Sequence, residues 1–200
     1  MLRAGLVPYL ILFMLVPRTL GQSPSDTWQK VQENGGGTLV IAYSENSPFI
    51  YNDAQGQLAG IEFEIMEEFV RYIDEKYGAD LNLEFEHLYD FASLIDTLKN
   101  SQRPILGIAS ISSLEERKRD FKITDPYMPD IEIIISSRDF GSISSLAEFA
   151  DMVKNNRAIT VTNSTFERNI LELQRDYIPD IEIEYVRHVD YLIEEISNSD

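Results

Sequence analysis

The sequence predicts an α/β protein in which each of two lobes contains a mostly parallel sheet flanked by helices. Apolar runs of strand length alternate with amphipathic helical patterns along nearly the whole chain, which is typical of parallel strands joined by right-handed crossovers. This alternation restarts after a polar segment, Ser136 to Ser142. We therefore expect a first lobe over residues 22–136 and a second lobe over residues 137–200.

The first 21 residues have the pattern of a cleaved export signal. Arg3 gives a basic start, and residues 4–17 carry no charge. This run is shorter than the roughly 20 residues that a membrane-spanning helix needs. Thr19 and Gly21 are small enough for cleavage before Gln22, so we expect the mature chain to be periplasmic.

The composition excludes several classes of function. Asp and Glu number 34 against 17 Lys and Arg, giving a net charge of −17, which argues against nucleic acid and anionic membrane surfaces as partners. The absence of cysteine excludes disulfides, thiolate metal sites and a Cys nucleophile. His87 and His188 are far apart in the sequence and have no metal-ligand spacing, so we expect no metal and no cofactor.

The elements of the first lobe follow from local patterns. Helices are predicted at residues 26–34, 61–77 and from 91 to about 98, and strands at 38–43, 81–85, 105–109 and 131–135. The strongest helix pattern follows Gly60 and ends at Gly78, because its apolar residues recur at spacings of three and four.

The second lobe repeats the alternation. Helices are predicted at residues 146–155, 165–177 and 190–196, and strands at 158–162 and 181–186. In such sheets, ligands bind beyond the carboxyl ends of the strands, in the turns that lead into helices.

One such turn follows the strand at 105–109 and contains three serines. Ser113 and Glu116 have capping-box spacing, which predicts a helical turn beginning near Ser113. Arg117 then lies in the first turn, where the helix dipole disfavours a cation. An external carboxylate, bound by two parallel hydrogen bonds, would explain that placement. The alternative is an ordinary cap followed by a solvated arginine.

A second turn of the same kind occurs in the second lobe. Asn163-Ser-Thr165 follows an apolar strand, and Ser164 with Glu167 again has capping-box spacing. Two helix N-termini that face each other, one from each lobe, would bind an anionic or zwitterionic small molecule. Two routine helix caps remain the competing interpretation.

These features resemble a known family, the extracellular solute-binding proteins of the polar amino-acid uptake type, which share the fold of ionotropic glutamate receptor ligand domains. The resemblance runs from about Asp26 to the end of the chain. Six segments occur in the family's order: Gly37-Thr-Leu-Val-Ile-Ala, Ser47-Pro-Phe49, Gly60-Ile-Glu-Phe-Glu64, Phe91-Ala-Ser-Leu-Ile, Ser110-x-Ser112-x-x-x-x-Arg117 with Thr124-Asp-Pro-Tyr127, and Asn163-Ser-Thr165-x-Glu167. The resemblance implies a two-lobed, periplasmic binding protein-like fold of type II.

The resemblance also implies roles for residues of the first lobe. Arg117 and Ser112 would hold the α-carboxylate of the ligand. Ser110 would meet its amine or carboxylate, and Phe91 would stack on its side chain.

In the second lobe, Ser164 and Thr165 would close over the ligand.

The chain departs from the family in two ways. Tyr43 and Asn46 stand where the family usually has an Asp and an aromatic residue, so they would bear on side-chain specificity, above all for cationic amino acids. The family's amine-binding acid lies beyond a further strand that these 200 residues do not reach, so we expect an incomplete second lobe within a longer protein.

The resemblance implies a monomeric binding protein that delivers an amino acid or a related small carboxylate to a membrane ABC permease, without catalysis. One alternative is a ligand-sensing module of a larger exported protein, such as a lytic transglycosylase or a signalling receptor. Another is an enzyme like cyclohexadienyl dehydratase, with Glu45, Glu62 or Glu64 as general acid. Stabilisation by the helix dipole is a simpler explanation for Glu62 and Glu64, which lie in a first turn.

Overall fold

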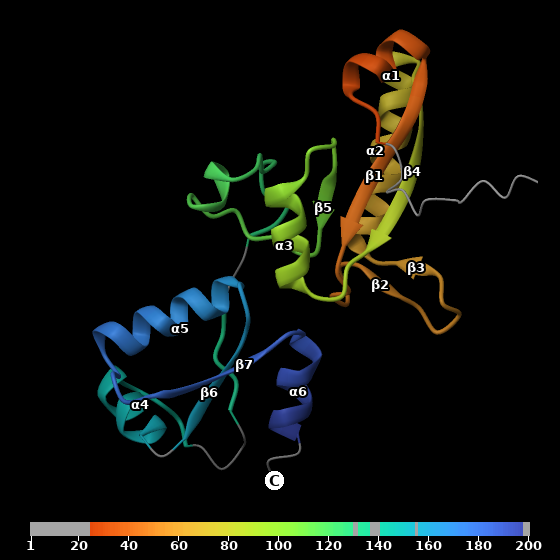
Figure 1. The fold of residues 1–200 in the computed structure, drawn as a ribbon. Helices are drawn as coiled ribbons and strands as arrows, with labels where there is room; N and C mark the ends of the chain where they lie inside the picture. Colours follow the sequence, from red (N-terminus) through yellow and green to blue (C-terminus); the bar gives the residue numbers. More distant parts are fainter. Residues whose placement is uncertain (1–24, 130–131, 137–140, 155, 198–200) are drawn as a thin grey trace, which may run out of the picture.

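The computed structural model of the chain describes residues 25–129, 132–136, 141–154 and 156–197. The predicted signal peptide lies outside these residues. Two sheet-and-helix units follow one another along the chain, and Figure 1 shows the second, in cyan to blue, beside the carboxyl-terminal part of the first. We call them the first lobe and the second lobe.

The first lobe is built on a three-stranded sheet with the order β4-β1-β5, in which β1 is parallel to both neighbours. Its elements are α1 (Trp28–Asn34), β1 (Gly36–Tyr43), β2 (Tyr51–Asn52), β3 (Leu58–Ala59), α2 (Ile61–Tyr77), β4 (Asp80–His87), α3 (Phe91–Asn100) and β5 (Leu106–Ile108). The two short strands β2 and β3 form a small antiparallel pair.

Helices α2 and α3 cover opposite faces of this sheet. Ile41 and Tyr43 of β1 belong to a core cluster with Phe63 of α2. Ala42, between them, belongs to a different cluster with Leu94 of α3. Because successive side chains of a strand point to opposite faces, the apolar run of β1 is buried on both sides, as the sequence predicts.

The second lobe contains a two-stranded parallel sheet, β6-β7. Its elements are α4 (Leu146–Val153), β6 (Arg157–Val161), α5 (Thr165–Asp176), β7 (Glu182–Val186) and α6 (Val189–Ser197). Phe149, Ile178 and Ile181 form its buried cluster. The α/β class and the parallel pairing predicted from the sequence are confirmed.

The predicted strand at residues 131–135 is wrong over the part that the structure describes. Residues 132–136 have no regular secondary structure, and Ile133 and Ile134 are 72% and 65% exposed. The apolar run has the composition of a strand, but a strand forms only when a neighbour pairs with its backbone. No strand among the described residues lies beside it.

The helical turn predicted from Ser113 is also wrong in position. The chain from residue 111 to 114 is irregular, and a short 3₁₀ helix, η1, spans Arg117–Arg119. Glu116 precedes it, and no side chain caps it. The capping-box spacing shows only that the local sequence could begin a helix. The backbone conformation here depends instead on the contacts of Arg117 that are described below.

The corresponding expectation for the second lobe is confirmed. Ser164 is the N-cap of α5, and its hydroxyl accepts a hydrogen bond from the Glu167 N–H group.

Among the residues that the structure describes, no helix is long and apolar enough to cross a membrane.

Gly60 is the residue on which the entry into α2 depends. It has φ +120°, in a region almost restricted to glycine, and a Cβ atom there would lie 2.3 Å from the Phe49 carbonyl oxygen. We predict that Gly60→Ala lowers the free energy of unfolding by about 2–3 kcal/mol, measured by urea titration of the full chain.

Gly56 provides the matched control for this substitution. It also has a positive φ, +75°, but a Cβ atom there would meet nothing within 4 Å. Gly56→Ala should therefore cost only the conformational term, about 1 kcal/mol. Equal losses for the two variants would show that the contact with Phe49 is unimportant.

Candidate functional site

Two loops that follow parallel strands meet between the lobes. Ser110 comes two residues after β5, and Asn163 comes two residues after β6. Both have positive φ angles, +54° and +60°, although neither is glycine. A positive φ is uncommon outside glycine, and Asn adopts it more readily than most other residues. It makes both loops turn sharply where the strands end.

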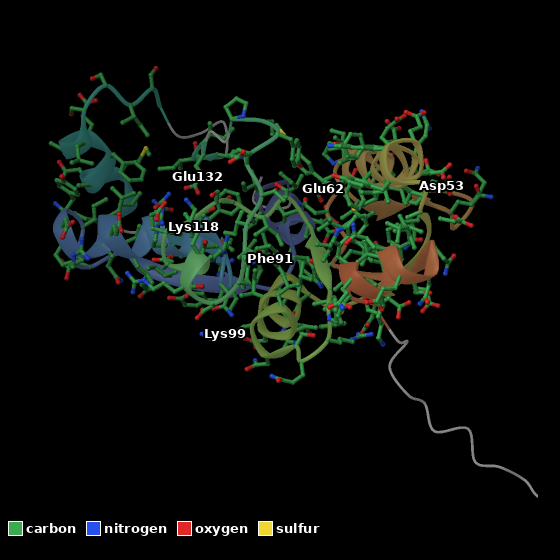
Figure 2. All side chains as sticks on the ribbon, turned by 90° about the horizontal axis from the view of Figure 1, so that it is seen from above. Asp53, Glu62, Phe91, Lys99, Lys118 and Glu132 are labelled. Atoms are coloured by element: carbon green, nitrogen blue, oxygen red, sulfur yellow. The ribbon has the colours of Figure 1, made fainter. Side chains whose placement is uncertain are left out.

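Arg117 connects these two loops. Its side chain is buried, with 7% of its surface exposed. One guanidinium nitrogen, Nη1, donates to the Ser112 carbonyl oxygen at 3.1 Å, and the other, Nη2, donates to the Asn163 carbonyl oxygen at 2.8 Å. The guanidinium carbon lies 5.4 Å from the centre of the Phe91 ring. Figure 2 shows Phe91 near the middle of the molecule, where the two lobes adjoin.

The charge of Arg117 has no acidic partner within salt-bridge distance among the described residues. Burial lowers the pKa of Arg117, and the nearby Arg168 lowers it further, while Glu116 acts in the opposite direction. The two carbonyl oxygens use two of the five donors that a guanidinium offers. A buried cation of this kind favours the binding of an anion.

The start of α5 adds donors on the side of the second lobe. Asn163 N–H donates to the Glu167 carboxylate, while Thr165, the first residue of α5, is buried. Since α5 has 12 residues, its N-terminal N–H groups carry the partial positive charge of a full helix dipole. Ser164 and Thr165 directly follow Asn163, whose carbonyl oxygen Arg117 contacts. The start of α5 thus lies beside that contact.

A separate polar cleft lies between the end of the second-lobe sheet and the start of α3, and Arg117 does not line it. It is lined by Asp90, Ala92, Ser93, Asp96, Thr162 and Arg187. Asp90 caps α3 by accepting a hydrogen bond from the Ser93 N–H group at 2.8 Å, and the Arg187 guanidinium lies 3.9 Å from its carboxylate. Residues at the carboxyl ends of β6 and β7 thus face the N-terminus of α3 across the cleft.

The structure brings together most of the residues predicted from the sequence. Arg117, Ser112 and Phe91 are in contact or within a few ångströms, and the Asn163 contact brings in the turn that contains Ser164 and Thr165. The Ser110 N–H group donates to the carboxylate of Glu62.

Two predicted residues occupy other surroundings. The Tyr43 ring is buried in the core of the first lobe, stacked on His87 at 5.0 Å and edge-on to Phe85 at 6.3 Å. Asn46 lies in the loop after β1, where its backbone pairs with Ile50. Their predicted part in specificity stays a prediction.

Sequence reasoning missed two features of this region. The carbonyl group of Asn163 is one, and its signal was an Asn directly after a strand, where left-handed backbone is expected. The other is the contact between Glu62 and Tyr127, a hydrogen bond of 3.0 Å. The sequence contains no local signal for that pair, because the two residues are 65 positions apart. Among the described residues, no three His, Asp or Glu side chains converge as metal ligands.

A curated relative is the membrane-bound lytic murein transglycosylase F of Saccharophagus degradans, to which the chain is 24% identical over 167 residues. That match covers 84% of this chain but only 31% of the relative. The chain therefore spans about a third of the length of that relative.

Among solved structures, an ancestral arginine-binding protein bound to arginine matches with a TM-score of 0.63 and 21% identity, over 80% of this chain and 66% of that one. An ancestral amino acid-binding protein, described as a precursor of cyclohexadienyl dehydratase, matches with a TM-score of 0.60 and 18% identity, over 86% and 69% of the two chains. At this identity the likeness establishes the fold, a two-lobed periplasmic binding protein architecture.

The family model of bacterial extracellular solute-binding proteins, family 3, matches residues 39–199, which include every loop of the site described above and most of both lobes. The chain belongs to family 3 of the bacterial extracellular solute-binding proteins.

Proposed function

We propose that this chain is a ligand-binding domain of an exported protein and captures an amino acid or a related small carboxylate between its two lobes. The observation that carries the proposal is Arg117, a buried guanidinium held by neutral carbonyl groups from both lobes. Taking a cation out of water is costly. A carboxylate that binds beside Arg117 supplies the missing negative charge and two parallel acceptors.

In this proposal, groups from both lobes contact the ligand. On the first lobe, Arg117 and Ser112 receive the carboxylate, Ser110 lies beside it, and the Phe91 ring offers a face for the ligand's side chain. On the second lobe, the N–H groups at the start of α5 approach the same anion. Because the ligand contacts both lobes, binding favours the closed arrangement over an open one.

Two biological roles fit this binding function. The first, expected from the sequence, is delivery of the ligand to a membrane ABC permease in the periplasm. The second is a sensing module within a longer exported enzyme. The second role is supported by the transglycosylase relative, of which this chain matches only 31%.

Catalysis by the chain itself is less well supported. The likeness to a dehydratase precursor makes Glu62 the natural candidate for a general acid. However, both of its carboxylate oxygens accept a hydrogen bond from the Ser110 N–H group, so the group is already engaged within the first lobe. We therefore favour binding without chemistry.

The binding proposal predicts a large loss of affinity in Arg117→Ala. The ligand carboxylate would lose its charged partner, which costs about 100-fold or more in affinity. Arg117→Lys keeps the charge but loses the paired geometry, so we expect a loss of about tenfold. Isothermal titration with L-arginine and the other standard L-amino acids, following a thermal-shift screen, measures these values.

Arg119→Ala is the matched control, because Arg119 lies in the same 3₁₀ helix and is exposed. It should bind as tightly as the unchanged chain. An amino acid that binds equally well to the unchanged chain and to Arg117→Ala would refute the part assigned to Arg117.

The sensing role predicts that the gene continues past codon 200 into a second domain. The activity of that longer protein, measured on purified peptidoglycan, should then change when the amino acid that binds is added. The same protein carrying Arg117→Ala should not respond. An unchanged activity in the presence of saturating ligand would instead favour the transport role.

A further inference from the structure

Glu62 is a buried carboxylate beneath the serine-rich turn. It is the second residue of α2 and is only 6% exposed. The Ser110 N–H group donates to both of its oxygens, at 2.9 and 3.0 Å, and the Tyr127 hydroxyl donates to Oε1 at 3.0 Å. One carboxylate thus joins three segments: α2, the turn after β5, and the loop that contains Tyr127.

The contact with Ser110 fixes an unfavourable backbone conformation. Ser110 has φ +54°, which costs a non-glycine residue roughly 1–2 kcal/mol. Its N–H group has both oxygens of an anion as acceptors, and hydrogen bonds to charged groups are the stronger kind. Two residues further on, the Ser112 carbonyl accepts from Arg117. Glu62 therefore fixes Ser110, which lies two residues before the carbonyl group that Arg117 contacts.

The contact with Tyr127 holds the other side of the site. Tyr127 follows η1 in the chain and is 51% exposed, yet its hydroxyl group is directed to the buried Glu62. Ser110 and Tyr127 bracket the segment that contains Arg117. By binding both ends of that segment, Glu62 limits the positions that Arg117 can take.

This arrangement is costly as long as Glu62 is ionised. Burial raises the pKa of Glu62, and the hydrogen bonds from Ser110 and Tyr127 offset only part of that effect. Burial, together with the adjacent carboxylate, also raises the pKa of Tyr127. Glu62 has no cationic partner among the described residues. An uncharged amide of the same shape would be cheaper to bury.

Other elements around the start of α2 contribute no charge to this group. The Glu62 N–H group donates to the Phe49 carbonyl oxygen, and Leu58, Leu83 and Phe85 pack on the cluster that includes α2. Tyr127 is therefore the titratable side chain that bears on Glu62 within the described part of the chain.

We propose that Glu62 is a positioning residue for the ligand carboxylate, which holds Ser110 and Tyr127 so that Ser112 and Arg117 are set to receive an anion. The proposal rests on the proposed function of the candidate site. It implies that the buried charge lowers the stability of the protein while it improves the geometry of the site.

The first test compares the stability of the unchanged full chain with Glu62→Gln across pH. Because the folded-state pKa of Glu62 is raised, ionised Glu62 opposes folding, and its cost grows as pH rises from the unfolded-state pKa and is complete above the folded-state pKa. Glu62→Gln should therefore raise the midpoint of thermal unfolding by about 2–4 °C at pH 8. The difference should close as pH falls below roughly 4.3, where the carboxyl group is neutral in both states.

The second test measures the serine turn without any ligand. A glutamine has one carbonyl oxygen in place of two, so the Ser110 amide should exchange its hydrogen about tenfold faster in Glu62→Gln. Tyr127→Phe removes one donor to the carboxylate, which raises the folded-state pKa of Glu62 further and should move upward the pH at which the stability difference reaches its full value. Glu64→Gln is the control, since Glu64 lies in the same helical turn but is exposed; it should lower stability slightly through the lost dipole interaction, instead of raising it, and leave exchange at Ser110 unchanged.

The third test is affinity for each standard L-amino acid that binds the unchanged chain. Glu62→Gln should weaken binding about tenfold although the variant is more stable at pH 8. Lower stability of Glu62→Gln at pH 8, or exchange at Ser110 equal to that of the unchanged chain, would overturn the proposal. If the unchanged chain binds none of these amino acids, the proposed function fails for them, and the stability and exchange measurements still decide the part of Glu62.

Discussion

The burial of one guanidinium between two backbone carbonyl groups is the interaction on which the candidate site depends. Arg117 reaches the Ser112 carbonyl in its own lobe and the Asn163 carbonyl in the other. Removing a guanidinium from water costs several kcal/mol, and two neutral acceptors return only part of that. The remaining cost favours an anion beside Arg117 despite a net charge of −17. The same contact also joins the lobes, so the residue that we propose binds the ligand is one that links them.

The backbone at two strand ends makes this contact possible. Parallel strands deliver their carboxyl ends to one edge of a sheet, and each lobe turns sharply there, at Ser110 and at Asn163. The Asn163 turn exposes the carbonyl that Arg117 uses. The Ser110 turn is held from below by Glu62. Rigid strands and one buried carboxylate thus place the groups that the ligand would meet.

Much of the fold was predictable because its signals are local. The apolar spacing and the glycines at both ends predict helix α2, and Ser164 with Glu167 predicts the start of α5. The strand predicted at residues 131–135 failed because strand formation depends on a pairing neighbour, which an isolated apolar run does not report. The helical start at Ser113 failed because long-range contacts of Arg117 outweighed a local capping pattern.

The candidate site divides in the same way. Arg117 was singled out because a cation near a helix start is unfavourable without an anion, but the helix start at Ser113 does not form, and the structure instead shows Arg117 buried beside a short 3₁₀ helix. Its carboxylate-binding role stays a prediction. The place of Glu62 was not predictable, because its contact with Ser110 joins residues 48 positions apart. Local reasoning offered the helix dipole as a sufficient explanation for Glu62, and only the folded chain shows that its carboxylate is buried.

A crystal structure of the chain purified with its bound amino acid tests the central claim most directly. The account predicts that the ligand's carboxylate oxygens lie within about 3 Å of the Arg117 guanidinium nitrogens, between Ser112 and the start of α5. A ligand whose carboxylate is bound elsewhere, with Arg117 still donating to the Ser112 and Asn163 carbonyl groups, would contradict it.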